Sequence, residues 1–162
     1  MENITIREIK DDEYGILEDM LYEAIFQKED VEPFPHEIIY EPEIYVFIDR
    51  FGSLPDDHCL VAEFDNKIVG AVWVRILDGE IKGYGNVDSY TPEFAISLFK
   101  QYRNKGYGTL LMKDMIRYLK SKGYKQASLS VDKNNYAAAM YLKLGFKIIE
   151  ERDHDYLMLL KL

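Results

Sequence analysis

The chain has 162 residues, which suits one folded domain, and we expect that domain to span residues 1–162. Hydrophobic residues make up 48% of the chain and charged residues 30%, spread along its whole length, which argues against intrinsic disorder. The net charge of −9 at pH 7 argues against a general nucleic-acid binder, because such a protein needs a basic face.

Further classes of protein are set aside by what the sequence lacks. Cys59 is the single cysteine, so the chain forms no internal disulfide and no cysteine zinc site, and the histidines show no metal spacing. No stretch approaches the roughly 20 apolar residues that a membrane span needs. The first four residues lack the basic and apolar blocks of a signal peptide. We therefore expect a cytoplasmic protein with no metal and no membrane partner.

The first third of the chain predicts one strand and two helices. Apolar and polar residues alternate over 4–9, which is the pattern of a strand. A helix follows an aspartate cap, with apolar positions at helical spacing as far as Ile25. Residues 31–42 contain three prolines and are expected to be irregular, and a second helix is expected between Pro42 and Gly52.

The rest of the chain combines strands with two more helices. Asp65, Asn66 and Lys67 predict a tight hairpin, and a glycine-rich passage occupies 79–85. The expected strands are 58–64, 68–76, 94–99, 126–131, 146–150 and 156–160, and the expected helices are 106–121 and 134–144. Successive strands indicate antiparallel pairing, whereas the strand–helix–strand unit over 94–131 indicates one parallel pair. The predicted fold class is mixed α/β, a mostly antiparallel sheet of about six or seven strands with helices on both faces.

One glycine loop is the most informative segment. It reads Arg103-Asn104-Lys105-Gly106-Tyr107-Gly108-Thr109 and lies between a strand and an amphipathic helix. Such a junction presents unpaired amides at the positive end of the helix dipole, and glycines let a bulky anion come close. A pyrophosphate is the natural ligand of this arrangement, and Arg103 and Lys105 add positive charge. The alternative is an ordinary strand-to-helix turn that merely needs two glycines. The pattern matches neither the nucleotide P-loop, G-x-x-x-x-G-K-[ST], nor the dinucleotide pattern G-x-G-x-x-G.

At this loop the sequence resembles the GNAT superfamily of N-acetyltransferases. That family carries [Q/R]-x-x-G-x-[G/A] here, and Arg103, Gly106 and Gly108 match it. Further on the family has an Asn, a small residue, a Tyr and a Gly-Phe pair, and this chain supplies Asn134, Ala137, Tyr141 and Gly145-Phe146 at matching spacing. The predicted order of elements is similar over nearly the whole chain.

The resemblance implies that acetyl-CoA is the co-substrate. Its pyrophosphate is expected on the amides of the loop 103–109, and its pantetheine arm on the backbone of Leu98 and Phe99. A bulge in that strand is expected to aim a backbone N–H, that of Leu98, at the thioester oxygen as an oxyanion donor. Asn134 is expected to hydrogen-bond the pantetheine arm.

The resemblance also implies two catalytic side chains. Tyr141 matches the general acid that protonates the departing thiolate, although a free tyrosine (pKa ~10) is about 2 kcal/mol too weak an acid for a thiol (pKa ~8.5). The alternative is that Tyr141 is a core aromatic residue. Glu93 is the first candidate for the general base that deprotonates the amine, and its alternative is a solvated strand-end carboxylate. Aromatic residues are candidates for the amine cleft: Tyr22, Phe26, Phe34, Trp73, Tyr84 and Tyr90.

The sequence thus predicts an acetyl-CoA-dependent N-acetyltransferase. A primary amine, on a small molecule or a peptide, would attack the thioester directly in a ternary complex, without an acyl-enzyme on Cys59. A second hypothesis is a module that binds acetyl-CoA or CoA as a sensor without catalysis. A third keeps the fold and loses the cofactor. A homodimer is compatible with the family, and the acidic charge tilts the acceptor slightly toward polycations.

Overall fold

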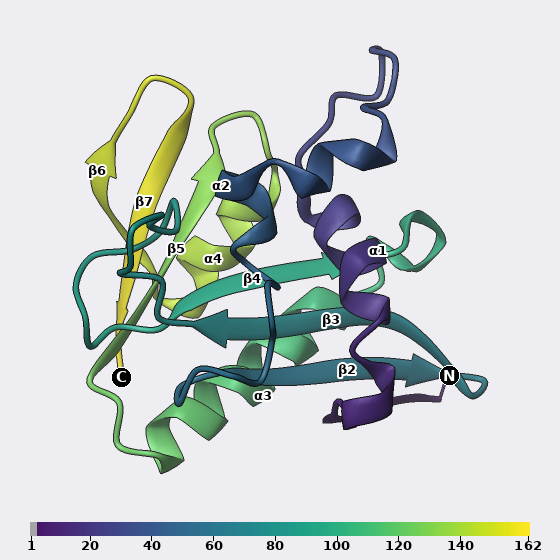
Figure 1. Cartoon of the computed structure of the whole chain (residues 1–162), viewed down its shortest axis with the longest axis horizontal. Helices are drawn as coiled ribbons and strands as arrows, with labels where there is room; N and C mark the ends of the chain where they lie inside the picture. The colour runs from purple at the N-terminus through teal and green to yellow at the C-terminus, as the bar shows by residue number, and fades with distance from the viewer. Residues whose placement is uncertain (1–2) are drawn as a thin grey trace.

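The structure is a computed structural model that describes residues 3–162. Its centre is one seven-stranded sheet with the order β1-β2-β3-β4-β5-β7-β6 (Figure 1). The strands are β1 (Ile4–Glu8), β2 (His58–Phe64), β3 (Lys67–Arg75), β4 (Glu93–Leu98), β5 (Gln126–Asp132), β6 (Lys147–Glu151) and β7 (Asp155–Lys161). Every neighbouring pair is antiparallel except β4–β5, which is parallel. The predicted fold class, with its single parallel pair, is confirmed.

The helices cover both faces of the sheet. α1 (Ile16–Ala24) and α2 (Pro42–Tyr45) lie on one face, and α3 (Tyr107–Ser121) and α4 (Ala137–Leu144) on the other. Single 3-10 turns stand at Asp11–Glu13, His36–Tyr40 and Lys100–Tyr102. Each face has its own hydrophobic core, one centred on Met20 and Trp73 and the other on Met112 and Met158. Among residues 3–162 no helix is both long and apolar enough to cross a membrane.

The second predicted helix is much shorter than expected. The sequence predicts it to run as far as Gly52, but the structure ends it at Tyr45 and continues in turns. A backbone carbonyl of this segment is used elsewhere, because Trp73 Nε1 donates to the oxygen of Phe47 at 3.0 Å. The apolar spacing did identify buried residues, because Ile48 and Phe51 are both buried. The carbonyls of this segment, however, accept hydrogen bonds from side chains of β3 where a helix would bond its own amides.

Arg75, at the end of β3, fixes this turn segment. Its Nη1 donates to the carbonyls of Val46 and Asp49, each at 2.9 Å. Its other nitrogens bind both oxygens of Asp57 at 2.8 and 3.0 Å, and its guanidinium lies 5.3 Å from the ring centre of Phe51. Because the two charged side chains are only 3% and 1% exposed, this is a buried, fully hydrogen-bonded ion pair.

The parallel pair at the centre of the sheet is very short. β4 and β5 are paired only at Glu93 and Ser128, where the Ser128 amide donates to the Pro92 carbonyl at 3.0 Å. Beyond this point the two strands have no further pairing, and Figure 1 shows β5 running away from β4. The sheet is therefore forked, and the edge of β4 that faces β5 lies open past Glu93.

Candidate functional site

The open edge of β4 carries backbone groups that the sheet does not use. In an antiparallel ladder, alternate residues bond the same neighbour. Phe99 donates its amide to Val69, the residue before Gly70 of β3, at 3.0 Å, so the amides of Leu98 and Ile96 are directed to the other side, into the fork. The Phe99 amide is thereby unavailable to a ligand, whereas that of Leu98 is positioned for one.

The expected bulge in β4 is wrong. The pairing between β3 and β4 runs without a break from Gly70–Leu98 to Arg75–Glu93. The irregularities of the sheet lie in β2 and β6. No bulge is needed to free the Leu98 amide, because the divergence of β5 leaves that edge unpaired.

The glycine loop forms the open N-terminus of α3. Asn104 and Gly106 adopt left-handed conformations, with φ of 61° and 86°, so the chain reverses sharply into the helix. Gly106 is the N-cap and supplies no side-chain hydrogen bond, and the helical ladder begins with the Leu110 amide donating to the Gly106 carbonyl. The amides of Gly108 and Thr109 precede that first bond and point out of the helix end. Asn104, Lys105 and Gly106 are exposed, as an anion site requires.

Arg103 is hydrogen-bonded to β4 and to α1. Its Nε donates to the Leu98 carbonyl at 2.9 Å, and its Nη2 to the carbonyl and carboxylate of Glu23 at 3.3 and 3.2 Å. The side chain therefore ties the end of β4 to the end of α1 and sets the shape of the loop. Its positive charge is largely offset by Glu23.

A surface hollow of about 360 Å³ lies beside this loop, between α3 and α4. Its lining residues are Thr109, Lys113, Met140, Lys143 and Leu144. Thr109 belongs to the first turn of α3, so the hollow continues the loop along the helix. The two lysines give it the local positive charge that an anionic ligand needs on an acidic protein.

Tyr141 lies on α4 on the same face of the sheet. It is 7% exposed, its ring centre is 6.0 Å from that of Phe146, and Phe146 in turn lies 5.8 Å from Phe94 of β4. Among residues 3–162 the Tyr141 hydroxyl has no hydrogen-bond partner. Burial raises the pKa of this phenol above its ordinary value, so the hydroxyl stays protonated. Burial therefore widens the difference between the pKa of this phenol and that of a thiol.

Glu93 lies at the root of the fork and is buried. Its side chain is on the α1 side of β4, as is that of Ser97, which donates to the Met20 carbonyl. The residue is 3% exposed; Oε2 accepts the Gly85 amide at 2.9 Å, and Oε1 has no hydrogen-bond partner. Burial raises the pKa of this carboxyl to about 7, against the lowering effect of the Gly85 amide and of Arg152. The interpretation as a solvated strand-end carboxylate is wrong, because the carboxyl is covered.

Asn134 lies on the surface just before α4. Its amide donates to the Asp132 carboxylate at 2.8 Å. The adjacent Asn135 caps the helix, because its Oδ1 accepts the Ala137 amide at 2.9 Å. The Asn134 side chain itself makes no hydrogen bond within residues 3–162.

Of the six aromatic candidates for an amine cleft, Phe26 is half-buried and Phe34 is exposed, and the other four separate into three groups. Trp73 and Tyr22 are buried in the core, and the hydroxyl of Tyr22 donates to the Phe34 carbonyl. Tyr84 is 48% exposed and stands beside Glu93, because its neighbours Gly83 and Gly85 lie on that carboxyl. Tyr90 is 82% exposed and lines a separate hollow.

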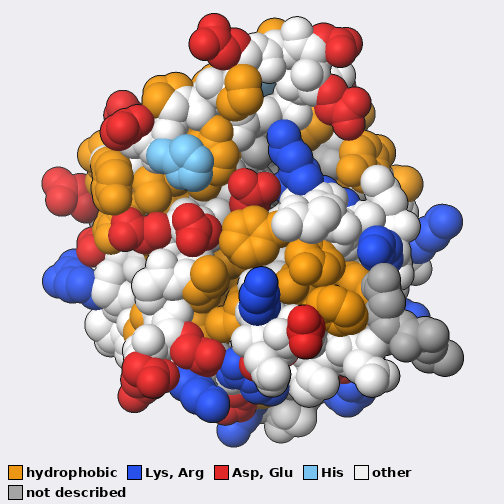
Figure 2. Space-filling model, turned by 90° about the vertical axis from the view of Figure 1, so that its right-hand side faces the viewer, with side chains coloured by type: hydrophobic (Ala, Val, Ile, Leu, Met, Phe, Trp, Pro, Cys, Tyr) orange, Lys and Arg blue, Asp and Glu red, His pale blue; other side chains and the backbone are white. Residues whose placement is uncertain are grey.

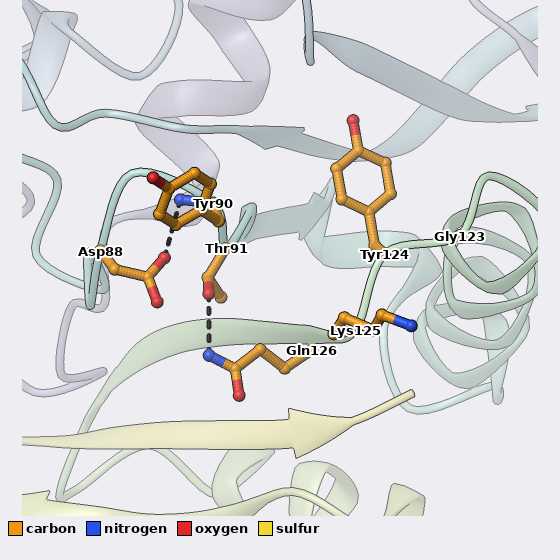
Figure 3. Close-up of a pocket in the computed structure, with 7 residues that line it drawn as sticks. All are labelled: Asp88, Tyr90, Thr91, Gly123, Tyr124, Lys125 and Gln126. Carbon is orange, nitrogen blue, oxygen red and sulfur yellow. Dashed lines mark hydrogen bonds between the residues drawn. The ribbon is translucent and has the colours of Figure 1, made fainter.

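That separate hollow is at the wrong end of the sheet for the fork. It measures about 260 Å³ and lies where β4 and β5 begin, between the segments 88–91 and 123–126 (Figure 3). The Gln126 amide nitrogen donates to the Thr91 hydroxyl at 2.9 Å across its floor. Since β4 and β5 diverge toward their other ends, this hollow is distinct from the open edge of β4.

Acidic residues are concentrated in the chain around α1 and α2. The segment 18–43 contains nine Asp and Glu residues and only one basic residue, Lys28, so it carries a charge of −8 (1 − 9) out of the total of −9. Figure 2 shows a face with hydrophobic side chains across its middle and acidic ones on its left and upper rim. This half of the molecule attracts cations.

No metal centre is formed in the part of the chain that the structure describes. Residues 3–162 contain no group of three or more His, Cys, Asp or Glu side chains that could hold a metal ion.

Comparison with known proteins agrees with this geometry. A Thermoplasma acidophilum PaiA N-acetyltransferase in complex with coenzyme A superposes with a TM-score of 0.71 at 22% identity, over 99% of each chain. The yncA acetyltransferase of Salmonella typhimurium with acetyl-CoA gives a TM-score of 0.69 at 18% identity, over 98% of this chain and 94% of that one. These two likenesses establish the fold.

Sequence comparison reaches further. A [ribosomal protein bS18]-alanine N-acetyltransferase of Haemophilus influenzae is 35% identical over 63 residues, which is 39% of this chain and 43% of that relative. The chain therefore aligns with less than half the length of this curated relative. The model of the acetyltransferase (GNAT) family matches residues 19–146, well over half of the chain and every segment of the site. The chain therefore belongs to the acetyltransferase (GNAT) family.

Proposed function

We propose that this protein is an acetyl-CoA-dependent N-acetyltransferase that acts on a primary amine in a ternary complex. The observation that carries the proposal is the fork between β4 and β5, because it combines a free backbone edge with an open helix N-terminus. An extended ligand with a pyrophosphate at one end matches both features. When bound, acetyl-CoA supplies an acetyl thioester, which the amine attacks with release of the CoA thiol.

Residues of β4 and α3 are proposed to hold the cofactor. The Gly108 and Thr109 amides bind the pyrophosphate, together with the exposed backbone from Asn104 to Gly106. A side chain at Gly106 would meet no atom within 4 Å, so the loop is open to a bulky anion. The Leu98 amide serves as oxyanion donor, and Lys113 and Lys143 provide positive charge along the hollow.

Arg103 is proposed to shape this cofactor site rather than to bind phosphate. Its bonds to Leu98 and Glu23 fix the end of β4. Asn134 is proposed to reach the pantetheine arm, because its side chain is exposed and unpaired at the start of α4. Phe99 keeps a place beside the arm but contributes no amide.

Tyr141 is proposed as the general acid. A phenol whose pKa is raised by burial does not give a stable phenolate. Its proton therefore passes to the sulfur as the carbon–sulfur bond breaks, in concert, and no separate ionised tyrosine is formed.

Glu93 is proposed as the general base. With a pKa raised to about 7, this carboxyl is a stronger base than an ordinary carboxylate and is still partly ionised at neutral pH. Its unpaired Oε1 is the atom that would accept the proton, directly or through water. The acceptor amine is proposed to enter on the acidic side of the sheet, where α1 and α2 lie.

The test is a thiol-release assay with acetyl-CoA over a panel of amines. The panel includes polyamines, amino acids and a peptide beginning with alanine, which is the acceptor that the name of the Haemophilus relative specifies. Tyr141→Phe is expected to lower turnover about 10²–10⁴-fold while leaving CoA-induced thermal stabilisation unchanged. Tyr136→Phe is the matched control, since Tyr136 is 68% exposed one turn earlier.

Two outcomes would contradict the proposal. Equal turnover in Tyr141→Phe would remove this residue from the mechanism. Stabilisation by acetyl-CoA without thiol release from any amine would favour the alternative, a module that only binds the cofactor.

A further inference from the structure

The glycine-rich turn after β3 is shaped around the Glu93 carboxyl. A Cβ placed on Gly83 would stand 1.8 Å from Glu93 Oε1, and one on Gly85 would stand 2.8 Å from Oε2 and 3.0 Å from the Leu129 backbone. Only glycine fits at either position, because the obstacle is a buried carboxyl or a strand backbone. The Gly83–Gly85 turn therefore covers Glu93 closely and excludes bulk water from it.

The turn is closed by the Asn86 amide, which donates to the Gly83 carbonyl at 3.1 Å, and is held further by bonds from outside. The Gly83 amide donates to the Leu77 carbonyl at 3.0 Å, and the Ser128 hydroxyl of β5 donates to the Gly85 carbonyl at 2.6 Å. The middle residue, Tyr84, is held by a charged group, since Arg152 Nη2 donates to its carbonyl at 2.7 Å. Arg152 comes from the connection between β6 and β7, on the far side of the fork.

Arg152 is itself held in place. Its backbone amide donates to the Asp155 carbonyl at 2.9 Å, and its Nε lies 3.4 Å from the Asp155 carboxylate and 3.6 Å from that of Glu150. That Nε is buried and makes no hydrogen bond of good geometry. These two acidic groups orient the guanidinium without fully occupying it, so that one end remains for Tyr84.

We propose that Arg152 is a positioning residue for the acetyl-transfer reaction: its bond to the Tyr84 carbonyl holds the Gly83–Gly85 turn, and with it the Gly85 amide, on the Glu93 carboxyl. The inference rests on the proposed function, because it takes Glu93 as the base. It assigns to a residue beyond both family motifs a part in setting the working pH of the enzyme.

The charges around Glu93 give the direction of this effect. The Gly85 amide and the Arg152 guanidinium both lower the pKa of the carboxyl, and burial raises it. Burial raises the pKa of the neighbouring Tyr84 hydroxyl, and the carboxylates of Glu43 in α2 and Asp155 in β7 raise it further. Arg152 is thus the charged side chain that acts on the Glu93 carboxyl. Its removal takes away both the charge and the bond that keeps the Gly85 amide in position.

The test compares Arg152→Gln with Arg152→Lys. The glutamine variant keeps a hydrogen-bond donor without the charge, and lysine keeps the charge. In Arg152→Gln the acidic limb of the pH profile of kcat/KM is expected to move up by at least about half a pH unit, and in Arg152→Lys most of that change should disappear. Arg117→Gln removes an exposed arginine of α3 as the control and should leave the limb in place.

A second readout does not depend on catalysis. We consider the difference in unfolding free energy between a protein and its Glu93→Gln variant, plotted against pH. This curve changes between the unfolded-state and folded-state pKa values of Glu93, and its bend at the higher pH marks the folded-state pKa. Measured in the Arg152→Gln background, that bend is expected at higher pH than in the wild type. An unmoved bend overturns the inference. A bend that moves while the kcat/KM limb stays supports Arg152 as the residue that tunes the carboxyl, and overturns Glu93 as the base.

Discussion

The buried carboxyl of Glu93 makes a sharp prediction about stability. Because the pKa of the folded-state carboxyl is about 7 against an ordinary value of 4.5, the folded protein keeps a proton that the unfolded chain has released. Stability from this group is complete below the ordinary value and is lost as the pH rises through 7. Each pH unit between the two pKa values costs about 1.4 kcal/mol, so the whole loss is about 3 kcal/mol.

Glu93→Gln removes this cost and keeps the shape. The amide oxygen accepts the Gly85 hydrogen bond, and the amide nitrogen takes the place of Oε1, which has no partner. The variant is therefore expected to be the more stable protein at alkaline pH while losing the general base. Relative to the difference between the two proteins in acid, the gain in unfolding free energy over the wild type should be about 3 kcal/mol near pH 8.5 and about 1 kcal/mol near pH 5.5.

Urea denaturation at these two pH values measures the effect. Subtracting the two proteins cancels the self-repulsion of the acidic chain, which is common to both. Glu37→Gln is the matched control, because Glu37 is exposed and the same change there should stay within about 0.5 kcal/mol at both pH values. A difference between wild type and Glu93→Gln that does not vary with pH would refute the argument, and with it the raised pKa on which the general base depends.

Two other buried groups also lend themselves to tests. Asp57→Ala leaves the Arg75 guanidinium buried without its partner and is expected to lower the unfolding free energy by about 3–5 kcal/mol in urea denaturation. Asp49→Ala, at a half-exposed ion pair, is the control and should cost less than about 1 kcal/mol. Equal losses in the two variants would mean that the buried pair contributes no more than the exposed one. The Cys59 thiol is 2% exposed and burial raises its pKa, so an aromatic disulfide reagent should leave it unmodified in the native protein and modify it in denaturant. Rapid native modification would show that this strand opens, and would also disqualify the reagent for thiol-release assays.

Much of the fold could be predicted from the sequence because its signals are local. The strand alternation, the Asp65-Asn66 turn and the glycine that ends α4 each depend on a few adjacent residues, and the structure has all of them. The second helix was predicted too long because its competitors are distant in sequence. Nothing in the segment 42–52 indicates that Trp73 and Arg75 will bond its carbonyls.

In the candidate site, too, the features that depend on adjacent residues could be predicted and those that depend on distant residues could not. The glycine loop of 103–109 and the spacing around Tyr141 are short patterns that a resemblance can find. The burial of Glu93 depends on Gly83 and Gly85, which were visible only as a glycine-rich passage. Arg152 left no signal, because its importance comes from a contact across 68 residues of chain. The same holds for the contact between Arg103 and Glu23, which spans 80 residues of chain.

The single parallel contact at Glu93 and Ser128 has a mechanical consequence. Backbone pairing joins strands β1–β4 to strands β5–β7 only at this place, whereas the hydrophobic core on the α3 side packs against both groups of strands. The buried Glu93 carboxyl therefore lies at the closed end of the fork, where the backbones of the two groups of strands are fixed to each other. The unpaired edge of β4 lies farther along the strand, so the position of the carboxyl is set by the protein itself.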